Sequence, residues 1–345
     1  MRISAIGEFA LIERIRRMLP RPHDALLGIG DDCAALRPTV GSDLLLTTDL
    51  LVDGVDFTQQ TITPFRLGRK AMGVNLSDIA AMGGLPRAAL VTLAIPPDED
   101  IEFVDELYRG LREEGAQFAV EVIGGDLSAS STLMIGVTLV GEVEAGRAVT
   151  RSGARPGEQI WVTGRLGAAA AGLMALRAGF RLLDDQVETP YEVSSSLQEA
   201  IRQAIERHLC PIPRIREGRA LAQAGVASAM IDLSDGLASD LAHLCRESGV
   251  SAKIREDQIP VDQAASAIAQ HFGQEPLALA LQGGEDFELL FTSSWDPADI
   301  AAMFPDAVTV TAVGKVGEAG QGCQLERQDG RAVALTGGYD HFRQQ

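Results

Sequence analysis

Acidic side chains that stand beside glycine or at the end of an apolar run are the residues of this sequence best suited to chemistry. The stretch LLGIGDDCAAL, residues 26–36, places Asp31 and Asp32 between apolar residues, with no lysine or arginine within four positions of either. A carboxylate without a partner is costly to remove from water, so these aspartates need something that neutralises them. Acids in similar surroundings recur along the chain as Asp49, Asp78, Asp126, Asp232, Asp235, Glu285 and Asp286.

Magnesium is the partner that this pattern indicates. Mg²⁺ prefers carboxylate oxygens, keeps several waters and usually shares its ligands with the phosphates of a substrate. Each position taken alone also has a structural explanation, because Asp31 and Asp32 fit a turn and Asp232 or Ser234 fits a helix cap. Asp49 is harder to explain in this way, since a charge inside a strongly apolar strand needs a reason. The number of such sites favours cations that neutralise the acids and bind phosphates through them.

The composition argues against two other classes of partner. The formal net charge of −18 opposes binding to nucleic acid and to anionic membranes, and an anionic ligand then needs metal cations beside it. The four cysteines lie far apart without a C-x-x-C pair, so we expect reduced thiols in a cytoplasmic protein. We expect no signal peptide, because Glu8 and Glu13 interrupt the first apolar run, and no membrane span around Arg177.

Other motifs for phosphate, metal or nucleophilic chemistry are missing from the sequence. It has no G-x-x-x-x-G-K-[ST] phosphate loop, no H-E-x-x-H zinc motif and no G-x-S-x-G hydrolase motif. GIGDDC lacks the third glycine of a dinucleotide fingerprint, and DLSDG lacks the ligand spacing of an EF-hand. The five histidines are scattered and form no metal-binding pair. Carboxylates are therefore the main candidates in this sequence for metal binding and catalysis.

Helices and strands must position these acids. In the first half, hydrophobic spacing predicts helices at 5–19, 64–84 and 98–115 and strands at 43–52, 90–95, 118–126 and 132–143. The stretch TRSGARPGEQ, residues 150–159, combines glycine, proline and charge and marks a boundary. In the second half, the same spacing predicts helices at 165–179 and 196–209, strands at 160–164, 283–293 and 307–316, and a strand that runs into a helix through an acidic turn at 226–249. Residues 181–196 look like a polar excursion.

Nine short motifs together resemble those of bacterial thiamine-monophosphate kinases. They are GEFALIERI, LLGIGDDCA, TTDLLVDGVDF, KAMGVNLSDIAAMG, VIGGD, TRSGARPGE, IDLSDGLASDL, GGEDFELLF and GYDHF. They occur in this order between residues 6 and 342, and their combination is specific although each motif alone is weak. This family belongs to a superfamily with aminoimidazole ribonucleotide synthetase and selenophosphate synthetase.

The resemblance implies an α+β fold of two domains. Residues 1–148 would form a mixed α/β domain that binds ATP and magnesium and pairs through its strands into a homodimer. Residues 149–345 would form an α+β domain that completes the active site. The implied reaction is magnesium-dependent transfer of the γ-phosphoryl group of ATP to thiamine monophosphate, which gives thiamine diphosphate and ADP. We further expect the domains to join near residues 143–155, with Asp49 and Asp126 of the first facing Asp232 and Asp235 of the second.

The resemblance also implies roles for individual residues. The magnesium ligands would be Asp32, Thr47, Thr48, Asp49, Asp78, Asp126, Asp232 and Asp235. The nucleotide would contact Asp32, Thr48, Gly125, Asp126, Arg151 and Ser234, and thiamine monophosphate would contact Asp56, Glu285 and Tyr339. Those expected to serve catalysis are Asp32, Asp126, Arg151 and Asp235. Asp56 departs from the family pattern, because many members carry histidine there.

A site of carboxylates and magnesium suits this reaction. The cations would remove the repulsion between two anionic phosphates and hold the reacting atoms in line. The nucleophile is a phosphate oxygen that is already ionised near neutral pH, so no general base is required. Arg151 is expected on the phosphates because its planar fork matches them, with a surface role as the alternative. Tyr339 would stack on a thiamine ring, with core packing as the alternative.

Three alternatives remain open. Another ATP-dependent enzyme of the superfamily is the nearest, although the sequence lacks both the reactive N-terminal cysteine expected of selenophosphate synthetase and the C-terminal cysteine expected of the hydrogenase-maturation relative. A non-catalytic protein that binds divalent metal and nucleotide would give no ADP when offered thiamine monophosphate. A two-metal phosphohydrolase would release free phosphate.

Overall fold

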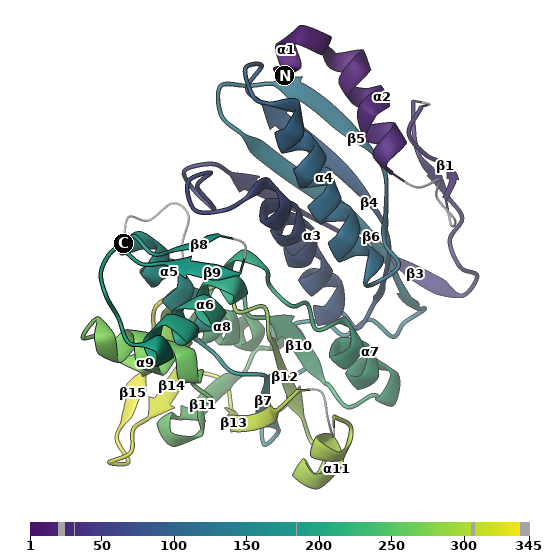
Figure 1. Cartoon of the computed structure of the whole chain (residues 1–345). Helices are drawn as coiled ribbons and strands as arrows, with labels where there is room; N and C mark the ends of the chain where they lie inside the picture. Colours follow the sequence, from purple (N-terminus) through teal and green to yellow (C-terminus); the bar gives the residue numbers. More distant parts are fainter. Residues whose placement is uncertain (20–24, 31, 184, 305–307, 339–345) are drawn as a thin grey trace. The chain divides into compact units, whose positions relative to one another are not determined.

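The computed structural model describes residues 1–19, 25–30, 32–183, 185–304 and 308–338 (Figure 1). The chain forms two compact units, Met1–Ile79 with Gly84–Gly146 and Ala80–Gly83 with Arg147–Gln345. The units divide after Gly146, whereas the sequence placed a domain boundary after residue 148. Both units combine helices with strands, which confirms the α+β class.

A four-stranded sheet forms the framework of the first unit. Its order is β3 (Ser42–Val52), β6 (Met134–Glu144), β4 (Leu85–Ile95), β5 (Glu121–Ala129). β6 pairs antiparallel with both β3 and β4, whereas β4 and β5 are parallel. A parallel pair needs a crossover connection, and α4 (Ile101–Ala116) supplies it.

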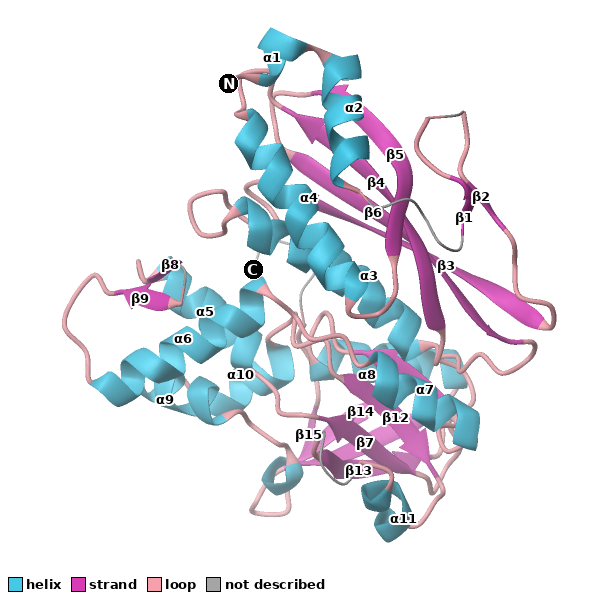
Figure 2. Ribbon diagram, turned by 45° about the vertical axis from the view of Figure 1, so that its right-hand side comes forward, coloured by secondary structure: helices cyan, strands magenta, loops and turns pink. Residues whose placement is uncertain are grey.

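Two helices, α3 (Pro64–Ala81) and α4, lie along one face of this sheet (Figures 1 and 2). Glycines let them approach closely. A Cβ at Gly68 would stand 2.1 Å from the carbonyl oxygen of Leu107, and one at Gly110 would stand 1.9 Å from that of Phe65. Because no side chain fits at either position, the backbones of α3 and α4 are in direct contact, which gives Asp78 on α3 a firm support.

The two faces of the sheet differ in burial, as the side chains of β3 show. Leu45 and Leu51 are buried, as expected of the face that the helices cover. The exposed apolar side chains of this strand are Leu44, Leu46 and Leu50. Alternation therefore places Thr47 and Asp49 on the covered face and Thr48 on the exposed one.

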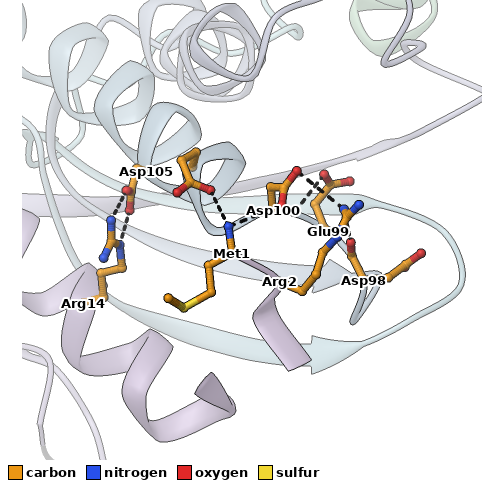
Figure 3. A network of polar contacts seen from close by, with 8 residues as sticks. Met1, Arg2, Arg14, Asp98, Glu99, Asp100 and Asp105 are labelled. Atoms are coloured by element: carbon orange, nitrogen blue, oxygen red, sulfur yellow. Dashed lines mark hydrogen bonds and ion pairs between the residues drawn. The ribbon is translucent and has the colours of Figure 1, made fainter. Parts of the chain in front are cut away.

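Ion pairs attach the N-terminal helices to α4. The single helix predicted at 5–19 is wrong, because Gly7, with a φ of 77°, separates α1 (Ile3–Ile6) from α2 (Glu8–Met18). The Met1 amine lies 3.3 Å from a Glu102 carboxylate oxygen. The Arg14 guanidinium makes a two-pronged contact with Asp105 (Figure 3). A short pair of strands, β1 (Ala25–Leu27) and β2 (Ala35–Leu36), flanks the GIGDDC motif.

A seven-stranded sheet forms the framework of the second unit. Its order is β10 (Ala229–Asp232), β12 (Leu289–Ser293), β7 (Gln159–Thr163), β13 (Val310–Gly317), β11 (Ser251–Arg255), β14 (Cys323–Glu326), β15 (Ala332–Ala334). All neighbours are antiparallel except β11 and β14. The strand predicted at 283–293 begins only at Leu289, because the residues before it form a loop.

The helices of the second unit form two groups. α8 (Leu237–Ser248) packs on the sheet and closes a core that includes Ile231, Leu241 and Leu290. The second group contains α5 (Ala168–Arg177), α6 (Ser195–Leu209), α9 (Gln263–His271) and α10 (Pro276–Gln282), beside the hairpin β8 (Arg181–Leu183) and β9 (Gln186–Glu188). The remaining helices are α7 (Ile215–Ala224), η1 (Glu256–Gln258) and α11 (Pro297–Ala302). None of the helices in the described part of the chain has the length and apolar character to cross a membrane.

Candidate functional site

Predicted metal ligands meet between β3 and α3 in the first unit. Asp78 Oδ2 accepts a hydrogen bond from Thr47 Oγ1. The backbone N–H of Asp49 donates to Asn75 Oδ1 at 3.1 Å, and Asn75 Nδ2 donates to the carbonyl of Ala71 at 3.0 Å. β3 stands at the edge of the sheet, so Asn75 supplies the acceptor that a further strand would otherwise provide. The sequence did not indicate this role of Asn75, which lies in the NLSD motif.

The carboxylates at this point repel one another. Removal from water, together with the charges of Asp78 and Asp56, raises the pKa of Asp49 to about 6. Asp56 follows β3 and accepts a hydrogen bond from the Val52 N–H at 2.9 Å. Three acids thus share one small region of the first unit. A cation there would relieve the repulsion, so the residues fit a metal ion by their chemistry.

A pocket of about 1180 Å³ covers the exposed face of the same sheet. It is lined by Asp32, Gly125 and Asp126, which are three of the predicted nucleotide contacts, and by Leu44 and Leu46. A Cβ at Gly125 would stand 1.9 Å from the carbonyl oxygen of Val91, and its φ of +155° also favours glycine. The volume is ample for a nucleotide.

The first unit does not bring all of its predicted ligands together. Asp126 lies on β5 and Asp49 on β3, which are the two edge strands of the sheet. Three strand spacings separate them, about 14 Å in a flat sheet. Thr48 projects to the exposed face, where its Oγ1 accepts from Thr138 Oγ1 at 3.1 Å. The described residues contain no group of three or more His, Cys, Asp or Glu side chains placed to hold one metal ion.

In the second unit, the motifs IDLSDG and GGEDFE lie side by side. β10 and β12 pair up to Asp232, and hydrogen bonds continue the ladder beyond the strands. The N–H of Leu233 donates to the carbonyl of Glu288 at 2.8 Å, and the N–H of Glu285 donates to that of Ser234 at 2.8 Å. The buried Asp232, the predicted nucleotide contact Ser234 and the predicted substrate contact Glu285 therefore share one region.

Asp240 adds a further carboxylate to this region. It is buried in the first turn of α8, and its Oδ2 accepts from the N–H of Asp235 at 3.1 Å. Burial, together with the charges of Asp232 and Asp235, raises its pKa to about 8. Asp240 was not among the site residues predicted from the sequence, although its helical spacing from Leu237 indicated a buried position.

Comparisons with known proteins identify the family. The model of the AIR synthase related protein N-terminal domain matches residues 30–143, and that of the AIR synthase related protein C-terminal domain matches residues 155–322. A thiamine-monophosphate kinase of Aquifex aeolicus is 37% identical over 345 residues, which cover 99% of this chain and 100% of the relative. The chain belongs to the thiamine-monophosphate kinase family.

Solved structures of thiamine-monophosphate kinases have the same fold as this chain. The crystal structure of the enzyme from Stenotrophomonas maltophilia K279a matches with a TM-score of 0.79 and 34% identity, covering 95% of this chain and 98% of that one. The structure of AaThiL complexed with AMPPCP and TMP matches with a TM-score of 0.74 and 34% identity, covering 99% of each chain. These full-length matches extend the resemblance seen in the motifs to the whole thiamine-monophosphate kinase fold.

Arg151, which the kinase family resemblance places on the nucleotide, belongs to the second unit. Arg151 is exposed, and its backbone carbonyl accepts from Ser248 Oγ at 2.9 Å. Tyr339, the expected partner of a thiamine ring, and Asp31 lie outside the described residues.

Asp286, which the sequence grouped with the possible metal ligands, caps a helix. Its oxygens accept from the N–H groups of Gly167 at 2.6 Å and Ala169 at 3.2 Å, at the start of α5. Burial raises the pKa of Asp286, and these two hydrogen bonds lower it. The resulting pKa is about 7. The helix that Asp286 caps lies far from it in the sequence. The GGEDFE motif therefore shows no local pattern that predicts this structural role.

Proposed function

We propose that this chain transfers the γ-phosphoryl group of ATP to thiamine monophosphate, which gives thiamine diphosphate and ADP. As a family member the chain is an enzyme, a kinase of thiamine biosynthesis. The observation that carries the proposal is the full-length match to a structure that holds AMPPCP and TMP. The acid clusters of both units and the pocket on the first sheet support it. They contain residues of the motifs that resemble those of the family.

Magnesium ions are the cofactor that we propose for this reaction. Their ligands would be Thr47, Asp49 and Asp78 around the β3–α3 contact, Asp32, Thr48 and Asp126 on the exposed sheet face, and Asp232 and Asp235 in the second unit. The raised pKa values of Asp49 and Asp240 support this proposal, because burial and neighbouring acids both disfavour their ionised forms, which a cation would stabilise. When bound, magnesium would neutralise the phosphates of the two substrates.

The chain's own residues would then bind and orient the reactants. A phosphate oxygen of thiamine monophosphate forms a bond to the γ-phosphorus, while the bond from that phosphorus to the bridging oxygen breaks and ADP leaves with the electron pair. Arg151 and Ser234 would hold the nucleotide, and Gly125 would let it approach the sheet closely. Asp56, Glu285 and Tyr339 would hold thiamine monophosphate, with carboxylates facing its cationic thiazolium ring. No side chain needs to remove a proton.

A second copy of the chain is the partner that we propose for the exposed sheet face. Leu44, Leu46 and Leu50 expose 48%, 70% and 57% of their surface there. Several exposed apolar side chains on one face of a strand are typical of an interaction surface, and pairing would remove them from water. We also propose a cytoplasmic location, which the four free cysteines support.

Product analysis tests the proposed reaction. The purified protein is incubated with ATP, thiamine monophosphate and Mg²⁺, and thiamine diphosphate, ADP and free phosphate are quantified. We expect equal amounts of thiamine diphosphate and ADP. Free phosphate without thiamine diphosphate would instead identify a phosphohydrolase, and binding of ATP without ADP formation would identify a non-catalytic protein.

A further inference from the structure

Two cysteines that lie far apart in the sequence come together in the second unit. Cys245 stands in the last turn of α8, and Cys323 is the first residue of β14. These two elements pack against each other. The lack of a C-x-x-C pair in the sequence therefore does not exclude a pair of neighbouring thiols in the fold.

Helical spacing places Cys245 on the face of α8 that packs on the sheet. It follows Leu241 by four residues and belongs, with Leu241 and Leu244, to the core of the second unit. Only 4% of its surface is exposed. Its carbonyl oxygen accepts a hydrogen bond from the N–H of Val250 at 3.0 Å, which fixes the end of the helix just before β11 begins.

Strand register places Cys323 on the face of the sheet that α8 covers. In the parallel pair of β11 with β14, Cys323 stands opposite Ala252, and Leu325 stands opposite Ile254. Ala252, Ile254 and Leu325 belong to the same core as Cys245, and Cys323 packs against that core. Because alternate residues of a strand share a face, the Cys323 side chain points toward α8. It stays partly accessible, whereas Cys245 is buried.

The two thiols interact, and their chemical character differs. A hydrogen bond from the Cys245 thiol to the Cys323 sulfur lowers the pKa of Cys323. The same hydrogen bond, together with burial, raises the pKa of Cys245. A partly accessible thiol that ionises readily beside a second thiol is the arrangement that peroxides oxidise selectively.

We propose that Cys323 and Cys245 are a redox-active pair, in which hydrogen peroxide oxidises Cys323 and Cys245 then forms a disulfide with it. The Cys323 thiolate attacks one oxygen of the peroxide, the O–O bond breaks, and a sulfenic acid forms while the released proton completes a water molecule. The Cys245 sulfur attacks the Cys323 sulfur, the S–O bond breaks, and the Cys245 proton leaves with the hydroxyl as a second water. The two electrons lost by the thiols reduce the peroxide. This site does not depend on the proposed kinase reaction.

Peptide mapping of the full-length protein tests the pair. The reduced protein is treated with an equimolar amount of hydrogen peroxide, and the remaining thiols are alkylated. We expect a disulfide between Cys245 and Cys323, while Cys33, which is exposed in the first unit, remains a thiol. Cys33→Ser is the matched control and should form the same disulfide. A disulfide that joins other cysteines, or oxidation of Cys33 ahead of Cys323, would overturn the inference.

Single substitutions separate the roles of the two thiols. In Cys245→Ser, Cys323 should persist as a sulfenic acid that dimedone traps, and Cys245→Ala serves the same purpose if serine impairs folding of the core. In Cys323→Ser, Cys245 should react with peroxide on the order of tenfold more slowly than Cys323 does in the wild type. Equal rates for the two thiols would contradict the assignment of Cys323 as the thiol oxidised first.

Thermal melts measure the effect of the bond on stability. Because the disulfide closes the loop from residue 245 to residue 323, it restricts the unfolded chain, and the oxidised wild type should melt several degrees above the reduced protein. Dithiothreitol should reverse this shift, as expected of a transient disulfide in a cytoplasmic protein. Cys323→Ser should melt at the same temperature with and without peroxide. A wild type that oxidation leaves unchanged or destabilises would overturn the predicted stabilisation.

Discussion

Asp235 lies in the turn between β10 and α8, beside two other aspartates. Its N–H donates to Asp240, and its charge contributes to the raised pKa of that residue. The backbone of this turn is therefore stabilised by Asp240. The family resemblance implies that the Asp235 side chain is a magnesium ligand.

Asp235→Asn separates a metal ligand from a structural residue, because asparagine keeps the size and most of the hydrogen-bonding ability of aspartate. We expect the rate of thiamine diphosphate formation to fall about a hundredfold or more. The melting temperature in chelator should change little or rise, since one negative charge beside Asp232 and Asp240 is removed. Enzyme assays and calorimetry provide the two readouts. Asp257→Asn, on an exposed acid of the same unit, is the control, and full turnover in Asp235→Asn would exclude the ligand role.

At the residue level, the sequence indicated the acids of the candidate site but not the residues that hydrogen-bond to the backbone beside them. Asp49 stood out as a charge in an apolar strand, and its contact region with α3 contains Asp78 as a second predicted ligand. Asp240 accepts the backbone N–H of Asp235 in the same motif, whereas Asn75 accepts that of Asp49 from another element. Such a role depends on which segments meet in space, which residue type and spacing do not specify.

At the level of elements, burial and two neighbouring acids disfavour the ionised form of Asp240 in the first turn of α8. The folded-state pKa of Asp240 is about 8, against an ordinary 3.8, because the residue is buried near two other acids. The folded protein binds this proton more tightly than the unfolded chain does. Its contribution to stability is therefore fully present below the unfolded pKa and is lost as the pH rises through about 8.

Asp240→Asn should therefore weaken the pH dependence of stability in the metal-free protein. We expect the melting temperature of the wild type to fall as the pH rises from about 4 to about 8, and that of the variant to fall less. Thermal melts in chelator across this range measure the difference. Asp257→Asn should keep the slope of the wild type. An equal slope in Asp240→Asn and the wild type would show that Asp240 does not titrate in this range.

Element prediction succeeded where periodicity was strong and failed where a loop or a break intervened. The helix at α6 and the strand at β3 follow from spacing, and they lie within one residue of the predicted bounds. Gly7 broke a helix that the apolar pattern had continued, and residues before Leu289 formed a loop although their sequence suited a strand. That loop is held by segments distant in the sequence, through His208, Arg214 and the DLSDG turn.

At the level of the whole molecule, the exposed face of the first sheet determines the expected assembly. Leu46→Asp places a charge on the part of this face formed by the edge strand β3, where the wild-type side chain is 70% exposed. We expect a dimeric wild type and a monomeric variant by light scattering coupled to size exclusion, because burying an unpaired carboxylate opposes pairing. Leu183→Asp, on an exposed leucine of the second unit, should remain dimeric. A wild type that is monomeric at micromolar concentration would contradict the proposed interface.

The central claim is that the acid clusters act through magnesium in phosphoryl transfer to thiamine monophosphate. It is tested most directly by the initial rate of thiamine diphosphate formation as a function of Mg²⁺ concentration, in the wild type and in Asp78→Asn. We predict that the wild-type rate saturates with Mg²⁺ and vanishes in excess chelator, and that the variant needs more Mg²⁺ and reaches a lower maximum. A rate that survives chelation, or identical curves for the two proteins, would contradict the account.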